Sequence, residues 1–511
     1  MVEIRRIWGS NHTRLLWFLG SVRCIILCLV LSSLVTFPAA AQIQQAWVER
    51  YNNGITNGTN QAVKMALDNV GNIYVVGVSQ NTNNQLGYVT IKYAPNGTQL
   101  WAARYDSTNY PSAMPAGMVL DNSNNVIVTG SALTIKYDTN GNRVWNAPYA
   151  GSALAVDTNG NVAVTGFGPN FNSVKINPSG SNLWEQQISP ASCGSTVGQA
   201  IVSDSNGNIY VVGSYPFTCE RGLVDNEMLL IKYSANGSQL WSATYSSGGP
   251  DAPVHVAGMD IDNSNNLYVL ATFPAVATYA TFKYSSGGSF VWSVTPNYNG
   301  NSEASGLALD HLGNVLVTGM AKYFSFYFQY GTFAINSNGS PVWTNYYPQP
   351  PAGVNAATSV AVDSANNSYV TGYSSGTNGT NNIVTIKYSP SGNQIWLQQY
   401  NGLNSGTDAG NAIAVDKNGN VYVTGYETLP GGGTGIVTIK YIPVSLQRHA
   451  DGTVLLEVQG SPGESFDIQA SADLLNWTDL GNVLADTNGL MQFDDTNASN
   501  FSARFYVPKP Q

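Results

Sequence analysis

A hairpin motif repeats eight times along the chain and constrains its fold more than any other feature. In the copy at 412–425, an apolar run leads to Asp416, a turn containing Asn418-Gly419 and a second apolar run that ends at Gly425. Valine suits a half-buried strand, and Asn-Gly tolerates the positive φ of a tight turn. The copies are centred on Asp68, Asp121, Asp157, Asp204, Asp262, Asp310, Asp363 and Asp416.

Two further strands follow most copies of the hairpin. After the copy at Asp68, the apolar segment 89–93 (Val-Thr-Ile-Lys-Tyr) leads through a second turn to Trp101. Each repeat therefore encodes four short strands, which we name A to D. A period of about 50 residues with four strands per unit predicts the blade of a β-propeller.

The tryptophans indicate how the ring closes. Seven of them follow a third strand and its turn: Trp101, Trp145, Trp184, Trp241, Trp292, Trp343 and Trp396. The eighth repeat reaches Tyr441 with no tryptophan of its own, whereas an unpaired copy of the missing strand, containing Trp47, precedes the first repeat. We therefore predict an all-β fold at 42–445, an eight-bladed β-propeller in which the N-terminal strand becomes strand D of the last blade. Such closure leaves no exposed sheet edge at the seam.

The consensus Ala-Val-Asp-x-x-Gly-Asn-x-Tyr-Val-Thr-Gly, then Thr-Ile-Lys-Tyr, then Asn-Gly-x-x-x-Trp, resembles the SBBP-type β-propeller repeat of secreted bacterial proteins. The resemblance covers roughly residues 46–443. Three copies depart from it: segment 130–133 is very short, Leu270-Ala271 replaces Thr-Gly, and Ala334 replaces the strand-C lysine. These departures affect the outlines of single blades, not the ring.

Residues 1–41 have the pattern of a signal peptide. Arginines such as Arg5 and Arg6 precede an apolar stretch from Cys24 to Val35, and Ala39-Ala40-Ala41 fits a cleavage site. The apolar stretch is short for a membrane span, so we expect a secreted or cell-surface protein without a membrane span after cleavage. Retention of the leader as an anchor is the alternative.

The charge balance bears on the partners. Removal of the leader leaves 17 basic and 29 acidic residues, a formal net charge of −12. An acidic surface disfavours nucleic acids and anionic membranes as partners.

Two cysteines remain after cleavage of the leader, Cys193 and Cys219, and both lie in the fourth repeat. The connections that carry them emerge on the same face of a blade. Because exported proteins meet oxidising conditions, we predict a disulfide between them. A reactive cysteine nucleophile is the rival interpretation, but no histidine neighbours either residue in sequence.

A second unit is expected at 446–511. Segments 454–458, 465–470 and 504–507 read as strands between turn residues. The residues Ser461-Pro462-Gly463, 470–478 and 504–506 resemble a small C-terminal β-domain of exported proteins from some environmental bacteria. The resemblance implies a β-sandwich-like domain, whose role in sorting, surface attachment or interdomain packing stays open.

The repeated polar residues have structural explanations. Each turn offers one aspartate, whereas tight calcium sites gather several carboxylates, so we interpret the aspartates as acceptors that stabilise the hairpins and expect no metal or cofactor. Strand C of most repeats carries a lysine, whose stem we expect between blades. These lysines are Lys92, Lys136, Lys175, Lys232, Lys283, Lys387 and Lys440. The tryptophans are interpreted as wedges that fill the gaps between blades.

The face that carries the D–A and B–C connections varies most in length and is the expected ligand face. Aromatic rings with scattered polar partners there could stack on sugars or grip a peptide. The candidate ligand-binding residues are Tyr215, Phe217, Arg221, His255, Tyr323, Tyr327, Tyr330, Tyr426 and Glu427. In the alternative interpretation, the aromatic run at 323–330 only lengthens two strands.

Three classes of function follow. The sequence favours an exported, non-catalytic scaffold for binding or adhesion with a glycan or protein ligand, since no conventional catalytic motif is present. A carbohydrate-active lyase or hydrolase built from loop residues on the same face is the first alternative. A structural cell-envelope protein is the second.

Overall fold

The computed structural model describes residues 42–109, 112–166, 170–189, 196–220, 223–246, 254–273, 278–296, 302–324, 327–347, 353–376 and 379–510. Within these ranges, only the backbone is described at 42, 217–220, 223–226 and 323–324. The predicted signal peptide and the predicted Cys193–Cys219 disulfide lie outside this description. No helix in the described ranges is both long enough and apolar enough to span a membrane.

The first four repeats each form a four-stranded antiparallel sheet in which strands adjacent in sequence pair with one another. Sheet 1 contains β2 (Asn60–Leu67), β3 (Ile73–Gln80), β4 (Leu86–Tyr93) and β5 (Gln99–Tyr105). Sheet 2 contains β6 (Pro115–Leu120), β7 (Val126–Gly130), β8 (Thr134–Tyr137) and β9 (Arg143–Ala147). Sheet 3 contains β10 (Ala153–Val156), β11 (Val162–Gly166), β12 (Phe171–Ile176) and β13 (Asn182–Ile188). Sheet 4 contains β14 (Val197–Ser203), β15 (Ile209–Glu220), β16 (Leu223–Tyr233) and β17 (Gln239–Tyr245).

The next three repeats follow the same plan. Sheet 5 contains β18 (His255–Ile261), β19 (Leu267–Phe273), β20 (Thr278–Tyr284) and β21 (Phe290–Val294). Sheet 6 contains β22 (Glu303–Leu309), β23 (Val315–Phe324), β24 (Tyr327–Ile335) and β25 (Pro341–Tyr347). Sheet 7 contains β26 (Ala356–Val362), β27 (Ser368–Ser375), β28 (Asn381–Tyr388) and β29 (Gln394–Tyr400).

The last repeat takes its fourth strand from the N-terminus. Sheet 8 contains β30 (Ala409–Val415), β31 (Val421–Thr428) and β32 (Thr434–Arg448), and β1 (Gln42–Tyr51) pairs antiparallel with β32. Trp47 lies opposite Lys440, just as Trp101 lies opposite Lys92 in sheet 1. The prediction that the N-terminal strand completes the last repeat is confirmed.

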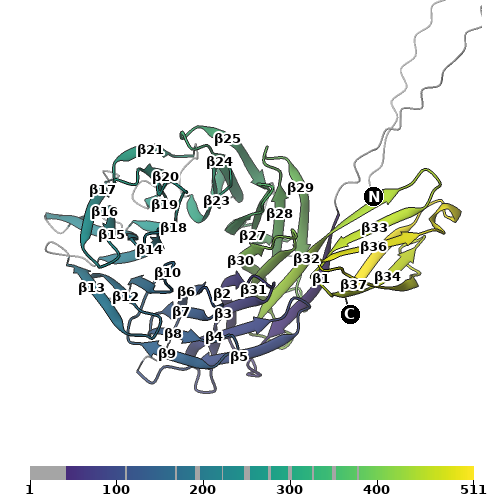
Figure 1. The fold of residues 1–511 in the computed structure, drawn as a ribbon, viewed down its shortest axis with the longest axis horizontal. Helices are drawn as coiled ribbons and strands as arrows, with labels where there is room; N and C mark the ends of the chain where they lie inside the picture. The colour runs from purple at the N-terminus through teal and green to yellow at the C-terminus, as the bar shows by residue number, and fades with distance from the viewer. Residues whose placement is uncertain are drawn as a thin grey trace, which may run out of the picture. The chain divides into compact units, whose positions relative to one another are not determined.

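The sheets are propeller blades arranged around a common centre (Figure 1). The first strand of each sheet contacts the first strand of the next, and β30 of sheet 8 contacts β2 of sheet 1. These eight first strands are therefore the inner strands. The connections that follow strands B and D emerge together on one face, which we call the upper face. Arg104 at the end of β5 illustrates this, because its guanidinium donates to Ser79 at the end of β3.

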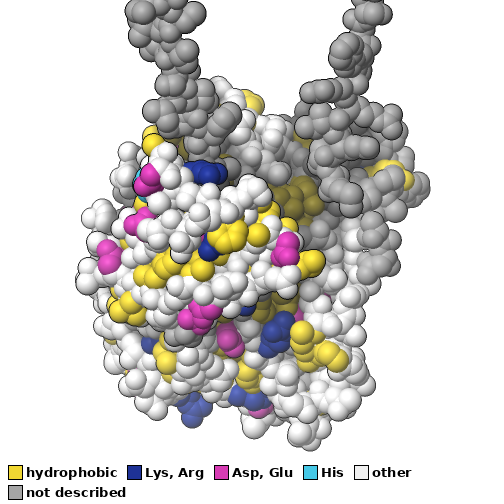
Figure 2. All heavy atoms as spheres, turned by 90° about the vertical axis from the view of Figure 1, so that its right-hand side faces the viewer, with side chains coloured by type: hydrophobic (Ala, Val, Ile, Leu, Met, Phe, Trp, Pro, Cys, Tyr) yellow, Lys and Arg dark blue, Asp and Glu magenta, His cyan; other side chains and the backbone are white. Residues whose placement is uncertain are grey.

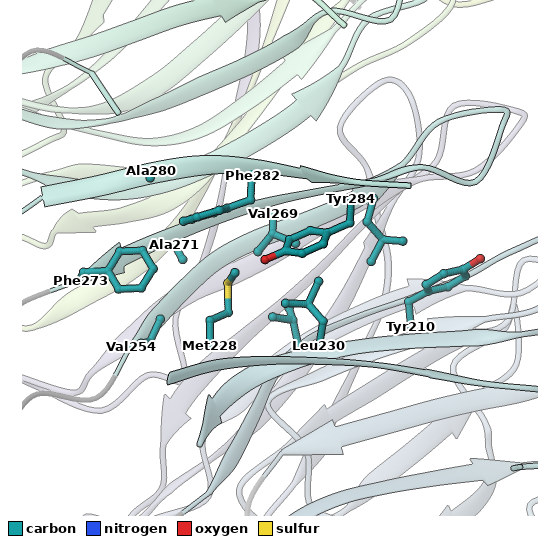
Figure 3. Close-up of a cluster of buried hydrophobic side chains, with 12 residues drawn as sticks. Tyr210, Met228, Leu230, Val254, Val269, Ala271, Phe273, Ala280, Phe282 and Tyr284 are labelled. Carbon is teal, nitrogen blue, oxygen red and sulfur yellow. The ribbon is translucent and has the colours of Figure 1, made fainter. Parts of the chain in front are cut away.

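Apolar side chains fill the space between neighbouring sheets. Between sheets 4 and 5, Met228 and Leu230 of β16 face Val269 of β19 and Phe282 of β20 (Figure 3). All four are fully buried. Because both faces of a middle strand are covered in this way, β3 and β19 read as nearly continuous apolar runs.

The C-terminal region continues directly from sheet 8. β32 runs through residue 448 and pairs with β33 (Val454–Gln459), which in turn pairs with β36 (Leu490–Asp495). A separate three-stranded sheet contains β34 (Ser465–Ser471), β35 (Thr478–Leu484) and β37 (Phe505–Pro510), and the 3-10 helix η2 (Ala498–Asn500) precedes β37. The predicted strands at 454–458, 465–470 and 504–507 are confirmed, whereas the sequence interpretation missed β35 and β36. Leu456, Val458, Phe466 and Ile468 from the two sheets share one buried cluster.

Candidate functional site

The repeated aspartates anchor the hairpin turns. In all eight turns, one carboxylate oxygen accepts the backbone N–H groups two and four residues later, and the other accepts the side-chain amide of the asparagine four residues later. Burial alone would raise the pKa of Asp157, but hydrogen bonds from Lys175 and Asn161 outweigh it and lower that pKa. Their role as turn acceptors is confirmed.

The strand-C lysines use two different partners. In sheets 2 and 3, Lys136 and Lys175 form ion pairs with their own turn aspartates at 2.8 Å, and these side chains are almost completely buried. In sheets 4 and 7 the lysine lies farther from its aspartate, at 3.7 Å. In these two sheets and three others, a tyrosine on strand B contacts the aspartate. Its hydroxyl donates to the aspartate at 2.8–3.5 Å, and the lysine lies 4.5–5.9 Å from the centre of its ring. The lysines are therefore bound within the fold and do not form a basic binding array.

Seven of the eight strand-D tryptophans each link their sheet to the next one by a hydrogen bond, whereas none is found for Trp396 among the described residues. The indole N–H donates to a carbonyl in the C–D turn of the following sheet at 3.0–3.2 Å. The pairs are Trp47–Pro95, Trp101–Thr139, Trp145–Pro178, Trp184–Ala235, Trp241–Ser286, Trp292–Ser337 and Trp343–Pro390. Glycine is required beneath these rings, since a Cβ at Gly141 would lie 2.7 Å from the nearest atom of Trp101. The contact between Trp47 and Pro95 joins sheet 8 to sheet 1 in the same way as the other pairs.

Two of the predicted ligand residues prove to be core residues. Tyr330 is fully buried between sheets 6 and 7, where its ring packs against Tyr347. Glu427 is also fully buried, and its two carboxylate oxygens accept from Arg50 and Tyr400 at 2.5 and 2.7 Å. Both side chains are buried against residues from other strands, so neither is exposed to a ligand.

The remaining candidates are placed differently. His255 is exposed on β18, Tyr327 is 41% exposed at the tip of the β23–β24 hairpin, and Tyr426 is half-buried on β31. Tyr215 is half-buried and packs against the core between sheets 3 and 4. The side chains of Phe217, Arg221 and Tyr323 lie outside the described residues.

The upper ends of sheets 6, 7 and 8 bring together an acid and two phenols, which we call the Glu303 cluster. Glu303 begins the inner strand β22, whereas Tyr373 of β27 and Tyr426 of β31 each follow a glycine near the upper end of strand B. Glu303 is exposed, and the two tyrosines are half-buried. His255 holds the position equivalent to Glu303 on β18, and β18 contacts β22.

The surroundings of the two phenols raise their pKa values. Burial raises the pKa of Tyr373, and the neighbouring Tyr426 and Glu303 raise it further. Burial also raises the pKa of Tyr426, with a contribution from Asp408. Both phenols are therefore protonated at neutral pH and able to donate hydrogen bonds. In the described part of the chain, no hydrogen bond or ion pair engages the polar side-chain atoms of Glu303, Tyr373, Tyr426 or His255.

The sequence interpretation missed Glu303 and Tyr373, although the repeat pattern contains the signal for both. Glu303 precedes its turn aspartate by seven residues, as His255 does, and Tyr373 follows its glycine as Tyr426 does. Aligning the eight copies by position would have placed these four residues at two neighbouring positions of the upper face.

Charged residues make up only 10% of the chain. Figure 2 shows a face on which scattered charged side chains lie among hydrophobic side chains, uncharged polar side chains and backbone. Within the described ranges, no three residues among His, Cys, Asp and Glu are grouped so that they could hold a metal ion.

Comparisons with known proteins bear on the fold. Residues 395–426 match the model of the SBBP β-propeller repeat. An uncharacterised WD repeat-containing protein of Acanthamoeba polyphaga mimivirus is 24% identical over 211 residues, which span 36% of this chain and only 14% of that protein. Among solved structures, the Dos1 propeller is similar with a TM-score of 0.52 at 12% identity, over 78% of this chain and 95% of that one. The WD40 domain of Neurospora crassa Pan2 aligns over 65% of this chain and 92% of its own, with a TM-score of 0.42 at 11% identity. This chain therefore carries the SBBP repeat, and its sheets are the blades of a β-propeller.

Proposed function

We propose that the chain is an exported, non-catalytic scaffold that binds a glycan or protein ligand at the Glu303 cluster. In this proposal the eight sheets form an eight-bladed propeller closed by β1, and residues 446–511 form a small β-sandwich-like domain. The order of the sheets and the pairing of β1 with β32 support the propeller. The leader at 1–41 supports export to the cell surface or the medium.

The contrast between the bound polar residues of the repeat and the free polar atoms of the Glu303 cluster supports the proposal. The aspartates, lysines and tryptophans of the repeat are engaged inside the fold, whereas the Glu303 cluster keeps its polar atoms free on the upper face. Bound polar residues of a repeat stabilise the ring, but free polar groups beside half-buried aromatic rings are typical of a recognition site. The cluster also departs from the repeat, because the position of Glu303 is alanine in sheets 7 and 8.

The chemistry of the cluster suits a hydroxyl-rich ligand. The two phenols donate hydrogen bonds, the Glu303 carboxylate accepts them, and the tyrosine rings offer apolar faces for the C–H face of a sugar. A peptide with a polar side chain would find the same groups, so the ligand class is a glycan or a protein segment.

The free acid also makes a carbohydrate-active enzyme the second candidate. A carboxylate and a protonated phenol side by side can serve as base and acid in lyase or hydrolase chemistry. Turnover of a polysaccharide by the native chain, lost in Glu303→Gln, would establish this candidate in place of the binding scaffold.

Removing the phenol hydroxyls is expected to weaken ligand binding. Residues 42–511 are screened on glycan and peptide arrays, and the affinity for each hit is measured by calorimetry. Each of Tyr373→Phe and Tyr426→Phe should raise Kd by about threefold to tenfold, because a lost hydrogen bond costs about 0.5–1.5 kcal/mol. Tyr327→Phe, on the same face but outside the cluster, is the control and should leave Kd unchanged. The proposal would be refuted if no glycan or peptide on the arrays bound, or if the Kd of every hit were the same for the native chain and both cluster variants.

A further inference from the structure

A cavity lies on the face opposite the Glu303 cluster. Its volume is about 840 Å³, and its walls come from the A–B turns of sheets 1 and 8, the C–D turn of sheet 1 and the C-terminal segment 461–465. The other sheets have equivalent turns but are not followed by this segment. The cavity is therefore particular to the seam where the ring closes.

The wall contributed by the C-terminal segment is held firmly in place. Glu464 forms an ion pair with Lys440 at 2.9 Å, and both side chains are buried. The side chain of Asn418 donates to the carbonyl of Gly460 at 3.2 Å. Because these contacts come from sheet 8 itself, the cavity has a preformed wall, as small-molecule sites usually do.

The lining offers acceptors, amides and aliphatic surface. Asp68, Asp416 and Glu464 contribute carboxylates, and Oε1 of Glu464 is buried and accepts no hydrogen bond from the described residues. Val70 is 69% exposed, and Pro95 also lines the cavity. Lys417 also lines the cavity, so three carboxylates stand against one lysine there. This excess of negative charge disfavours an anion, and an aliphatic wall suits the C–H face of a sugar ring.

We propose that this seam cavity binds an uncharged sugar of one or two units, independently of the Glu303 cluster. Its volume lies within the range of about 300–1,000 Å³ that is typical of small-molecule sites. A sugar hydroxyl brings the donor that Oε1 of Glu464 lacks, and the amides of Asn69, Asn96 and Asn418 supply donors in return.

The test uses residues 42–511 and methyl glycosides of a neutral hexose, an amino sugar and a uronic acid, with binding followed by ligand-observed NMR and calorimetry. The native chain should bind the neutral glycoside and bind the uronate at least tenfold more weakly. Asn96→Trp, which places a large ring in the cavity, should abolish binding. Asn338→Trp is the matched control, because Asn338 holds the equivalent exposed turn position in sheet 6, and it should bind normally.

The opposite results overturn the proposal. They are no binding of the neutral glycoside at millimolar concentration, preference for the uronate, or equal binding by the native chain and Asn96→Trp. Tyr426→Phe separates the two sites, since binding that falls in this variant but not in Asn96→Trp belongs to the Glu303 cluster.

Discussion

Replacing Trp47 with alanine is expected to lower the free energy of unfolding by about 3–5 kcal/mol, the usual cost of truncating a large aromatic residue in a core. The side chain is 9% exposed and belongs to the cluster between sheets 8 and 1. Its indole donates to Pro95 at 3.0 Å and its ring lies 6.2 Å from that of Tyr422. The substitution therefore removes core volume and the hydrogen bond that joins the first strand of the chain to sheet 1.

The effect of Trp47→Ala is measured by equilibrium unfolding in guanidinium chloride, followed by tryptophan fluorescence. Trp477→Ala serves as the control, because Trp477 is 37% exposed in the C-terminal region, and its truncation should cost far less. Equal losses in the two variants would show that the strand containing Trp47 does not support the ring.

Lys440→Met is expected to cost about 3–5 kcal/mol, since removal of one partner leaves the other charge buried without compensation. Lys440 is fully buried, and its ammonium group donates to Glu464 at 2.9 Å and to the Pro95 carbonyl at 3.1 Å. After the substitution, the backbone N–H of Ser461 remains as a donor to Glu464, but among the described residues no other cation pairs with the carboxylate.

Lys387→Met is the matched control for this second prediction. Lys387 holds the same position in sheet 7, opposite Trp396, but lies 3.7 Å from Asp363 and its side chain is 18% exposed. Its loss should cost less than half as much in the same unfolding experiment. If the two methionine variants are equally stable, the ion pair between the ring and the C-terminal segment is not a principal contact.

The course of the chain could be predicted because the same local signals recur. Each turn carries an aspartate and a residue that accepts positive φ, which is glycine at Gly71 and asparagine at Asn124. The unmatched Trp47 predicted closure for the same reason, since every other strand D has its own tryptophan. Such signals lie within a few residues of one another, so each of the eight copies can be recognised from the sequence alone.

The candidate site was only partly predictable, because burial depends on partners distant in sequence. The sequence around Glu427 does not indicate that Arg50, 377 residues away, is its partner. Similarly, the aromatic run at 323–330 is expected on the ligand face, but its last residue, Tyr330, is buried against sheet 7. The partners of the strand-C lysines depend on whether strand B supplies a tyrosine, which a comparison of positions between repeats would have shown.

Ring closure by the N-terminal strand is the central claim, and a cross-link tests it most directly. Glu49 and Thr438 are paired across β1 and β32, and directly opposed residues of antiparallel strands are close enough for a disulfide. Oxidation of the Glu49→Cys/Thr438→Cys variant should give a peptide joining positions 49 and 438 in nearly all native molecules. Glu49→Cys combined with Thr385→Cys, at the equivalent position of sheet 7, should give none. Cross-linking in the control pair, or none between positions 49 and 438, would contradict the account.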